Sequence, residues 1–164
     1  MATNKSSGTN FGFLGQYDTV LVGVASLAEQ YFADDPVTSL MKLRQFGELL
    51  AQQVAARAGV FVAVEEAQSD LLARLRRDTA YPRDVIDLFH DLRRVGNDAV
   101  HQHRGDYGTA LTALKVARQL AVWFHRTFGD RGFRACQSAL NSFQGTAPKT
   151  FHFVRSVSAV FCAA

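Results

Sequence analysis

Residues 106–129 read DYGTALTALKVARQLAVWFHRTFG, and this stretch decides the fold. Its apolar residues recur at steps of three and four, the spacing that places side chains on one face of an α-helix. Asp106 can cap the first turn, and Gly129 can end the helix. Leu120 and Trp123 widen the apolar face, so we predict a central, well-buried helix. The main stripe comprises Ala110, Leu111, Leu114, Ala117, Ala121, Phe124 and Phe128.

The segments before this helix also show helical periodicity, and residues that begin or end helices separate them. Asp35 and Ser69 are predicted N-caps, and Gly59 is a predicted stop. Only residues 61–64 resemble a strand, and only briefly. We therefore expect an all-α fold, a bundle of four to five helices. The predicted earlier helices span residues 17–32, 36–58 and 69–77, with a fourth that Pro82 opens and that ends between residues 96 and 103.

Composition excludes several classes of protein. The 164 residues, 48% hydrophobic and 20% charged, suit one compact domain with a real core. Cys136 and Cys162 have no ligand-spaced Cys or His beside them, so neither a disulfide framework nor a zinc site is indicated. No apolar run reaches the length of about eighteen residues that a membrane helix needs. We expect a cytoplasmic protein that uses no metal or cofactor and does not bind membranes.

Positive charge is concentrated in the second half of the chain. The formal net charge is only +3, but residues 71–134 hold twelve Lys or Arg against seven Asp or Glu. The rest of the chain holds six against eight. This asymmetry favours a polyanionic partner. The alternative is that these charges are the solvated faces of ordinary helices.

Residues 87–101 read DLFHDLRRVGNDAVH, and their polar side chains form a pattern. Steps of three, four, three and four place five of them on one helix face. Guanidinium binds phosphate oxygens bidentately and imidazole titrates near neutral pH, so the face is a candidate phosphate site. A plain solvent-facing side is the alternative. Gly96 costs a helix about 1 kcal/mol relative to Ala, which indicates a close contact there. The five residues are Asp87, His90, Arg94, Asn97 and His101.

Residues 92–101 resemble the Arg-x(4–6)-His signature of the HEPN superfamily, with six residues between Arg94 and His101. Further stretches strengthen the resemblance and extend it over residues 11–133. Together they resemble a HEPN-like domain of unknown function, which is similar to the N-terminal module of bacterial type I restriction motor subunits and related helicase-like defence proteins. These stretches are residues 31–36, 43–48, 87–90 and 117–124.

The resemblance implies a helical bundle in which two subunits bring their motifs together, so we expect a homodimer. Active HEPN ribonucleases cleave RNA without a metal, the 2′-hydroxyl attacking the adjacent phosphate. Carried over, His101 is the general acid or base, and Arg94 stabilises the charge developing on the phosphate. Asn97 orients the phosphate or His101. The further predicted nucleic-acid contacts are His90, which is also a weaker second acid or base candidate, Arg93 and Arg104.

Arg44 and Glu48 are predicted supporting residues. They stand one turn apart in the helix predicted over residues 36–58, so they can form an intrahelical ion pair. The alternative is that Glu48 reaches across to orient Arg94 or His101 from a neighbouring helix.

Three functions stay open. The first is a nucleic-acid-binding or subunit-binding module of a bacterial restriction or defence system, with RNA, DNA or a restriction or helicase subunit as partner. No Gly-x-x-x-x-Gly-Lys-Ser/Thr loop occurs in the sequence, so we expect the ATPase motor to be separate. The second is a metal-independent endoribonuclease acting through Arg94 and His101, and the third is a non-catalytic dimerisation scaffold. We expect a disordered segment over residues 1–10, the HEPN-like domain over residues 11–133 and an atypical tail over residues 134–164, which we interpret as a truncated or frame-shifted linker.

Overall fold

The computed structural model describes residues 8–134, and these residues contain helices but no β-strand. The all-α prediction is therefore confirmed, and the suggestion of a strand over residues 61–64 is wrong. Predictions for residues 1–7 and 135–164 lie outside the described residues. The elements are a short 3-10 helix η1 (Gly12–Gln16) and the helices α1 (Thr19–Tyr31), α2 (Pro36–Arg57), α3 (Gln68–Asp78), α4 (Arg83–Gln102) and α5 (Tyr107–Phe128).

Local capping chemistry sets most helix boundaries. The carboxylates of Asp35 and Asp106 accept hydrogen bonds from the backbone N–H of Thr38 (3.0 Å) and Thr109 (2.9 Å), which confirms both predicted caps. Gly59, after α2, has φ +72°, a left-handed conformation that suits glycine. The predicted cap at Ser69 is wrong, because α3 begins one residue earlier at Gln68 and its N-cap is Ala67.

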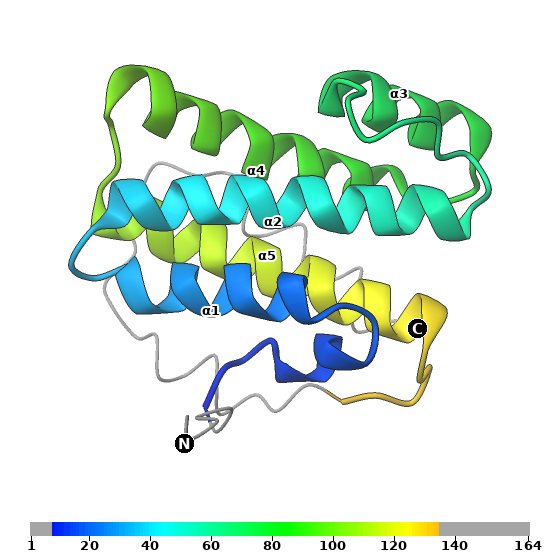
Figure 1. The fold of residues 1–164 in the computed structure, drawn as a ribbon, viewed down its shortest axis with the longest axis horizontal. Coiled ribbons are helices and arrows are strands. Elements are labelled where there is room, and N and C mark those ends of the chain that lie inside the picture. Colours follow the sequence, from blue (N-terminus) through cyan, green and yellow to red (C-terminus); the bar gives the residue numbers. More distant parts are fainter. Residues whose placement is uncertain (1–7, 135–164) are drawn as a thin grey trace.

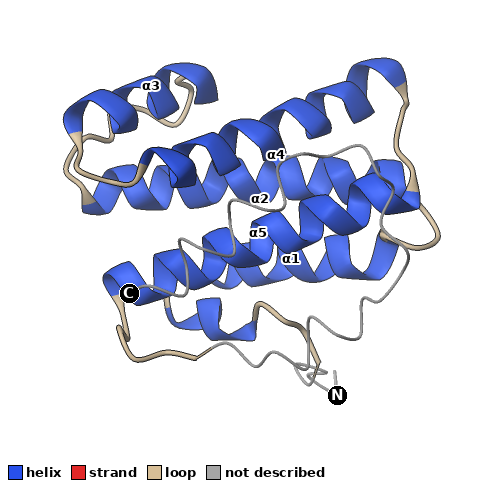
Figure 2. Cartoon of the chain, turned by 180° about the vertical axis from the view of Figure 1, so that it is seen from behind, coloured by secondary structure: helices blue, strands red, loops and turns tan. Residues whose placement is uncertain are grey.

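Helix α2 occupies the middle of the bundle and contacts α1, α3, α4 and α5. Figure 1 shows α4 running alongside α2, with the short α3 beside one end of both. Seen from behind in Figure 2, α5 lies between α4 and the N-terminal part of the fold. Helix α5 buries thirteen residues, which confirms the prediction of a central, well-buried helix. No described helix is long and apolar enough to span a membrane.

The N-terminal segment is attached to this bundle. The carboxylate of Glu29 in α1 accepts hydrogen bonds from the Thr9 hydroxyl (2.6 Å) and the Asn10 side-chain amide (2.7 Å). Phe11 is fully buried and packs edge-on against Phe46 of α2. The expectation of disorder over residues 1–10 is therefore corrected for Thr9 and Asn10. Their hydrogen-bond partner, Glu29, is remote in sequence, so the local composition could not indicate it.

The crossing of α2 and α4 is unusually close at Gly96. A Cβ atom on Gly96 would lie 2.3 Å from Arg44 Cβ and 3.1 Å from the Leu40 carbonyl oxygen. This confirms the close contact predicted from a glycine inside a helix. The helix continues past Gly96 to Gln102 and ends where His103 adopts a left-handed conformation, with φ 48°. Glycine at residue 96 therefore allows α2 and α4 to pack closely, and it does not end α4.

Candidate functional site

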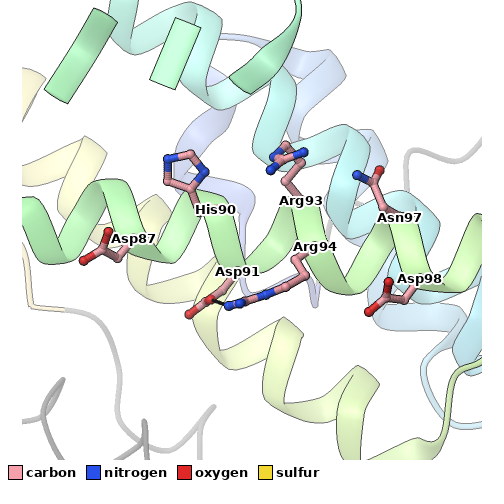
Figure 3. A pocket seen from close by; sticks show the side chains of 7 residues that line it. All are labelled: Asp87, His90, Asp91, Arg93, Arg94, Asn97 and Asp98. Carbon is pink, nitrogen blue, oxygen red and sulfur yellow. Dashed lines mark hydrogen bonds and ion pairs between the residues drawn. The ribbon is translucent and has the colours of Figure 1, made fainter. Parts of the chain in front are cut away.

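The outer face of α4 carries the predicted polar residues. Leu88, Leu92 and Ala99 on the opposite face are buried, so the core fixes the rotation of the helix. The predicted single polar face is therefore present. The described residues that line an open hollow along this face are Asp87, His90, Asp91, Arg93, Arg94, Asn97 and Asp98 (Figure 3).

These side chains divide into two rows along the helix. Figure 3 shows His90, Arg93 and Asn97 projecting toward the side where α2 and α3 lie, and we call this row the α2-facing edge. The other row projects toward α5, and we call it the α5-facing edge. It consists of Asp87, Asp91, Arg94 and Asp98. The two edges therefore differ in charge, with a guanidinium, an imidazole and an amide on the α2-facing edge and mainly carboxylates on the α5-facing edge.

Arg94 on the α5-facing edge already has a partner. Its guanidinium forms an ion pair with Asp91, one turn earlier in α4, and its side chain is 70% exposed. Asp87 is engaged by Arg76 of α3 in the same way. Exposed ion pairs of this kind contribute only about 0 to 1 kcal/mol, so a phosphate can displace Asp91 from Arg94. In the chain alone, however, the positive charge of Arg94 is compensated.

Arg44 reaches the α2-facing edge from α2. Its Nε donates a hydrogen bond to Asn97 Oδ1 at 2.7 Å. The predicted ion pair between Arg44 and Glu48 is absent among the described residues, and Glu48 forms no ion pair there with Arg94 or His101 either. The reason is the contact at Gly96, which brings the α4 backbone against the stem of Arg44 and places the neighbouring amide within reach. Arg44 therefore joins the site directly, whereas Glu48 does not.

His90 and Arg93 complete the α2-facing edge. Arg93 forms no ion pair within the described part of the chain, and its Nε is buried without a hydrogen-bond partner there. Burial lowers the pKa of the His90 imidazole, and the nearby Arg93 and Arg76 lower it further against the opposing effect of Asp87 and Asp91. His90 is therefore neutral at neutral pH, in surroundings where cations outweigh anions.

His101 and Arg104 lie beyond the hollow. Both are exposed, His101 in the last turn of α4 and Arg104 in the loop that follows. Arg94 and His101 are seven residues apart, which is about 10 Å along the helix axis. The structure thus pairs Arg94 with Asp91 and Asn97 with Arg44, and it does not bring Arg94 and His101 together within one chain.

Sequence reasoning missed a buried polar contact near the end of α5. His125 of α5 is 5% exposed. Its Nδ1 lies 2.8 Å from the Tyr17 hydroxyl oxygen, and its ring packs against Phe13 and Phe133. This group holds the segment before α1 against α5. Its position within the wide apolar face of α5 was the signal for burial, but nothing in the sequence indicated its partner.

Comparison with known proteins relates this chain to part of a restriction enzyme. The chain is 37% identical over 123 residues to the type I restriction enzyme EcoKI endonuclease subunit of Escherichia coli (strain K12). The match covers 75% of this chain but only 10% of the E. coli subunit. No protein-family model and no solved structure matches the sequence. The chain therefore contains a domain related to one segment of a type I restriction enzyme endonuclease subunit.

Proposed function

We propose that this chain is a nucleic-acid-binding module of a type I restriction system and that it binds through the outer face of α4. The observation that carries the proposal is the α2-facing edge, where Arg93 has no carboxylate partner and His90 lies beside it. Cations without protein partners can release counterions from a phosphate backbone on binding, which supplies affinity. The relation to an endonuclease subunit of a restriction enzyme supports a nucleic-acid partner.

The proposal treats the fold as HEPN-like and the chain as a homodimer in a bacterial cytoplasm. Arg104 extends the cationic surface past the end of α4, where a positive group also suits the helix dipole. The exposed His101 lies beside it in the last turn of α4. A homodimer would present two α4 surfaces to one nucleic acid and raise the affinity for longer strands. A restriction or helicase subunit is the alternative partner for the same surface.

Binding is tested by fluorescence anisotropy with labelled single-stranded RNA, single-stranded DNA and duplex DNA in EDTA over a series of KCl concentrations. We expect affinity to fall steeply with salt. Arg93→Gln should lower it about fivefold and reduce the slope of log K against log salt by about one. The control is Arg131→Gln, which removes an exposed cation after α5. An affinity that does not change with KCl concentration, or no binding to any of the three nucleic acids, contradicts the proposal.

A metal-independent endoribonuclease is the second candidate function. The observation that favours it is that Arg94 and His101 lie on the same exposed face of α4, where a second chain can approach both. Because about 10 Å along the helix axis separates Arg94 from His101, the motif of a second copy would have to bring the complementary group to one phosphate. Cleavage of labelled RNA to cyclic-phosphate ends in EDTA by wild type, and not by His101→Ala, establishes this function. A folded dimer that neither binds nucleic acid nor cleaves RNA would indicate the third function, a non-catalytic dimerisation scaffold.

A further inference from the structure

Arg44 is held in a fixed position before any ligand arrives. Its Cβ and Cγ pack against the α4 backbone at Gly96, where an added Cβ would come within 2.3 and 3.1 Å of them. Its Nε is bonded to Asn97 Oδ1 at 2.7 Å. Ordering a long side chain on binding normally costs affinity, and here most of that ordering is already present in the folded chain.

The hydrogen bond to Asn97 leaves the charge of Arg44 uncompensated. A guanidinium has five N–H donors, and only the Nε donor of Arg44 has a partner among the described residues. The acceptor is a neutral amide oxygen. By contrast, other arginines of α3 and α4 are bonded to carboxylates, which neutralise them; these are Arg74, Arg76, Arg77 and Arg94. The remaining donors of Arg44 are therefore available to an anion.

Asn97 connects Arg44 to the hollow along α4. It lines this hollow with Arg93, which lies one turn earlier on the same edge and has no ion pair within the described residues. The Asn97 amide nitrogen makes no hydrogen bond within the same part of the chain, so it offers two more donors. The carboxylate beside it in sequence, Asp98, projects from the α5-facing edge (Figure 3).

We propose that Arg44, Asn97 and Arg93 together bind one phosphate group at the crossing of α2 and α4. The chemistry is that of a phosphodiester, met by two guanidinium groups and an amide, and the inference rests on the proposed nucleic-acid binding of the α4 face. It assigns to Arg44 direct contact with the ligand and to Asn97 the additional task of orienting Arg44. The site is separate from Arg94 and His101.

Variants of Arg44 separate geometry from charge. In anisotropy with a labelled single-stranded oligonucleotide, Arg44→Gln should weaken binding about tenfold, because it removes a charge-assisted phosphate contact. Arg44→Lys keeps the charge but loses the Nε donor and the planar fork, so we expect it to be at least about threefold weaker than wild type. Lys42→Gln is the matched control, since it removes one charge from the same helix, and it should change affinity less than twofold. Thermal unfolding of each variant establishes that it is folded.

A second measurement uses wild-type protein and inorganic phosphate. The Arg44 Nε–H resonance in ¹H–¹⁵N NMR should shift and saturate as phosphate is added, and Asn97→Ala should weaken that response. Full oligonucleotide affinity in folded Arg44→Gln overturns the inference and leaves the proposed function standing. If wild type binds no nucleic acid, the proposed function fails, and the phosphate titration then tests the phosphate site alone. A saturating shift of the Arg44 Nε–H resonance supports a site for a small phosphorylated ligand. The absence of a shift overturns the inference.

Discussion

The backbone of Gly96 lies directly against the side chain of Arg44, so that a Cβ at residue 96 would be 2.3 Å from Arg44 Cβ. The Leu40 carbonyl oxygen, 3.1 Å from the same point, blocks a shift toward α2. Gly96→Ala therefore forces α2 and α4 apart, and we expect it to lower the free energy of unfolding by about 1 to 3 kcal/mol despite the better helix propensity of Ala. Urea unfolding followed by circular dichroism measures the change.

A matched glycine supplies the control. Gly23 lies inside α1, is exposed, and has nothing within 4 Å of an added Cβ. Gly23→Ala should raise the free energy of unfolding by about 0.5 to 1 kcal/mol, because only helix propensity changes. Equal effects of the two substitutions would show that the α2–α4 crossing is looser than described.

The sequence predicted this part of the fold better than it predicted the site. Local signals predicted the caps at Asp35 and Asp106 and the buried face of α5. Gly96 indicated a close contact, because glycine is costly inside a helix. For the partner in that contact, Arg44, the sequence favours an ion pair with Glu48, because both lie on one helix. The choice between a partner on the same helix and one on a neighbouring helix depends on how α2 and α4 cross, which one sequence does not specify.

The same limit applies to Arg94. Its position in an Arg-x(4–6)-His pattern predicts that Arg94 is free to bind a phosphate, but Asp91, one turn earlier in α4, compensates its charge. Spacing places residues on a face but does not decide which of several charged neighbours will pair. His101, on the same face, stays a prediction that only a functional assay can test.

Removal of the Asp91 carboxylate should strengthen binding to nucleic acid. Asp91→Asn frees Arg94 and deletes one negative charge from the lining of the hollow. We expect affinity for a single-stranded oligonucleotide to rise about three- to tenfold and the salt slope to steepen by about one. Glu65→Gln, which removes an exposed carboxylate from the loop between α2 and α3, should have little effect. Unchanged affinity in Asp91→Asn would mean that Arg94 does not face the phosphate backbone.

Stability should depend on pH through His90. Its pKa in the folded chain is lowered by burial, Arg93 and Arg76, while in the unfolded chain it returns to about 6.5. The unfolded chain therefore binds the proton more readily in the window below pH 6.5. The contribution of neutral His90 to the free energy of unfolding is therefore fully present above pH 6.5, and it is lost as pH falls through the folded pKa. The free energy of unfolding of wild type minus that of His90→Gln should decrease on acidification across this window, and a difference that stays flat contradicts the assignment.

Gln68, the first residue of α3, offers a test of packing against the middle of α2. Its side chain is 7% exposed, and neither its amide nitrogen nor its amide oxygen has a partner among the described residues. The amide nitrogen lies 3.9 Å from the position of a Cβ on Gly47, so it faces the α2 backbone. A buried polar group without a partner costs about 1 to 3 kcal/mol. Gln68→Met keeps the unbranched shape and removes both polar atoms.

We therefore expect Gln68→Met to raise the free energy of unfolding by about 1 kcal/mol and Tm by about 3 to 6 °C. Gln30→Met, at an exposed position of α1, is the control and should stay within about 0.5 kcal/mol of wild type. Differential scanning calorimetry measures both. A lower Tm in Gln68→Met would contradict this expectation and indicate that the Gln68 amide is hydrogen-bonded in solution.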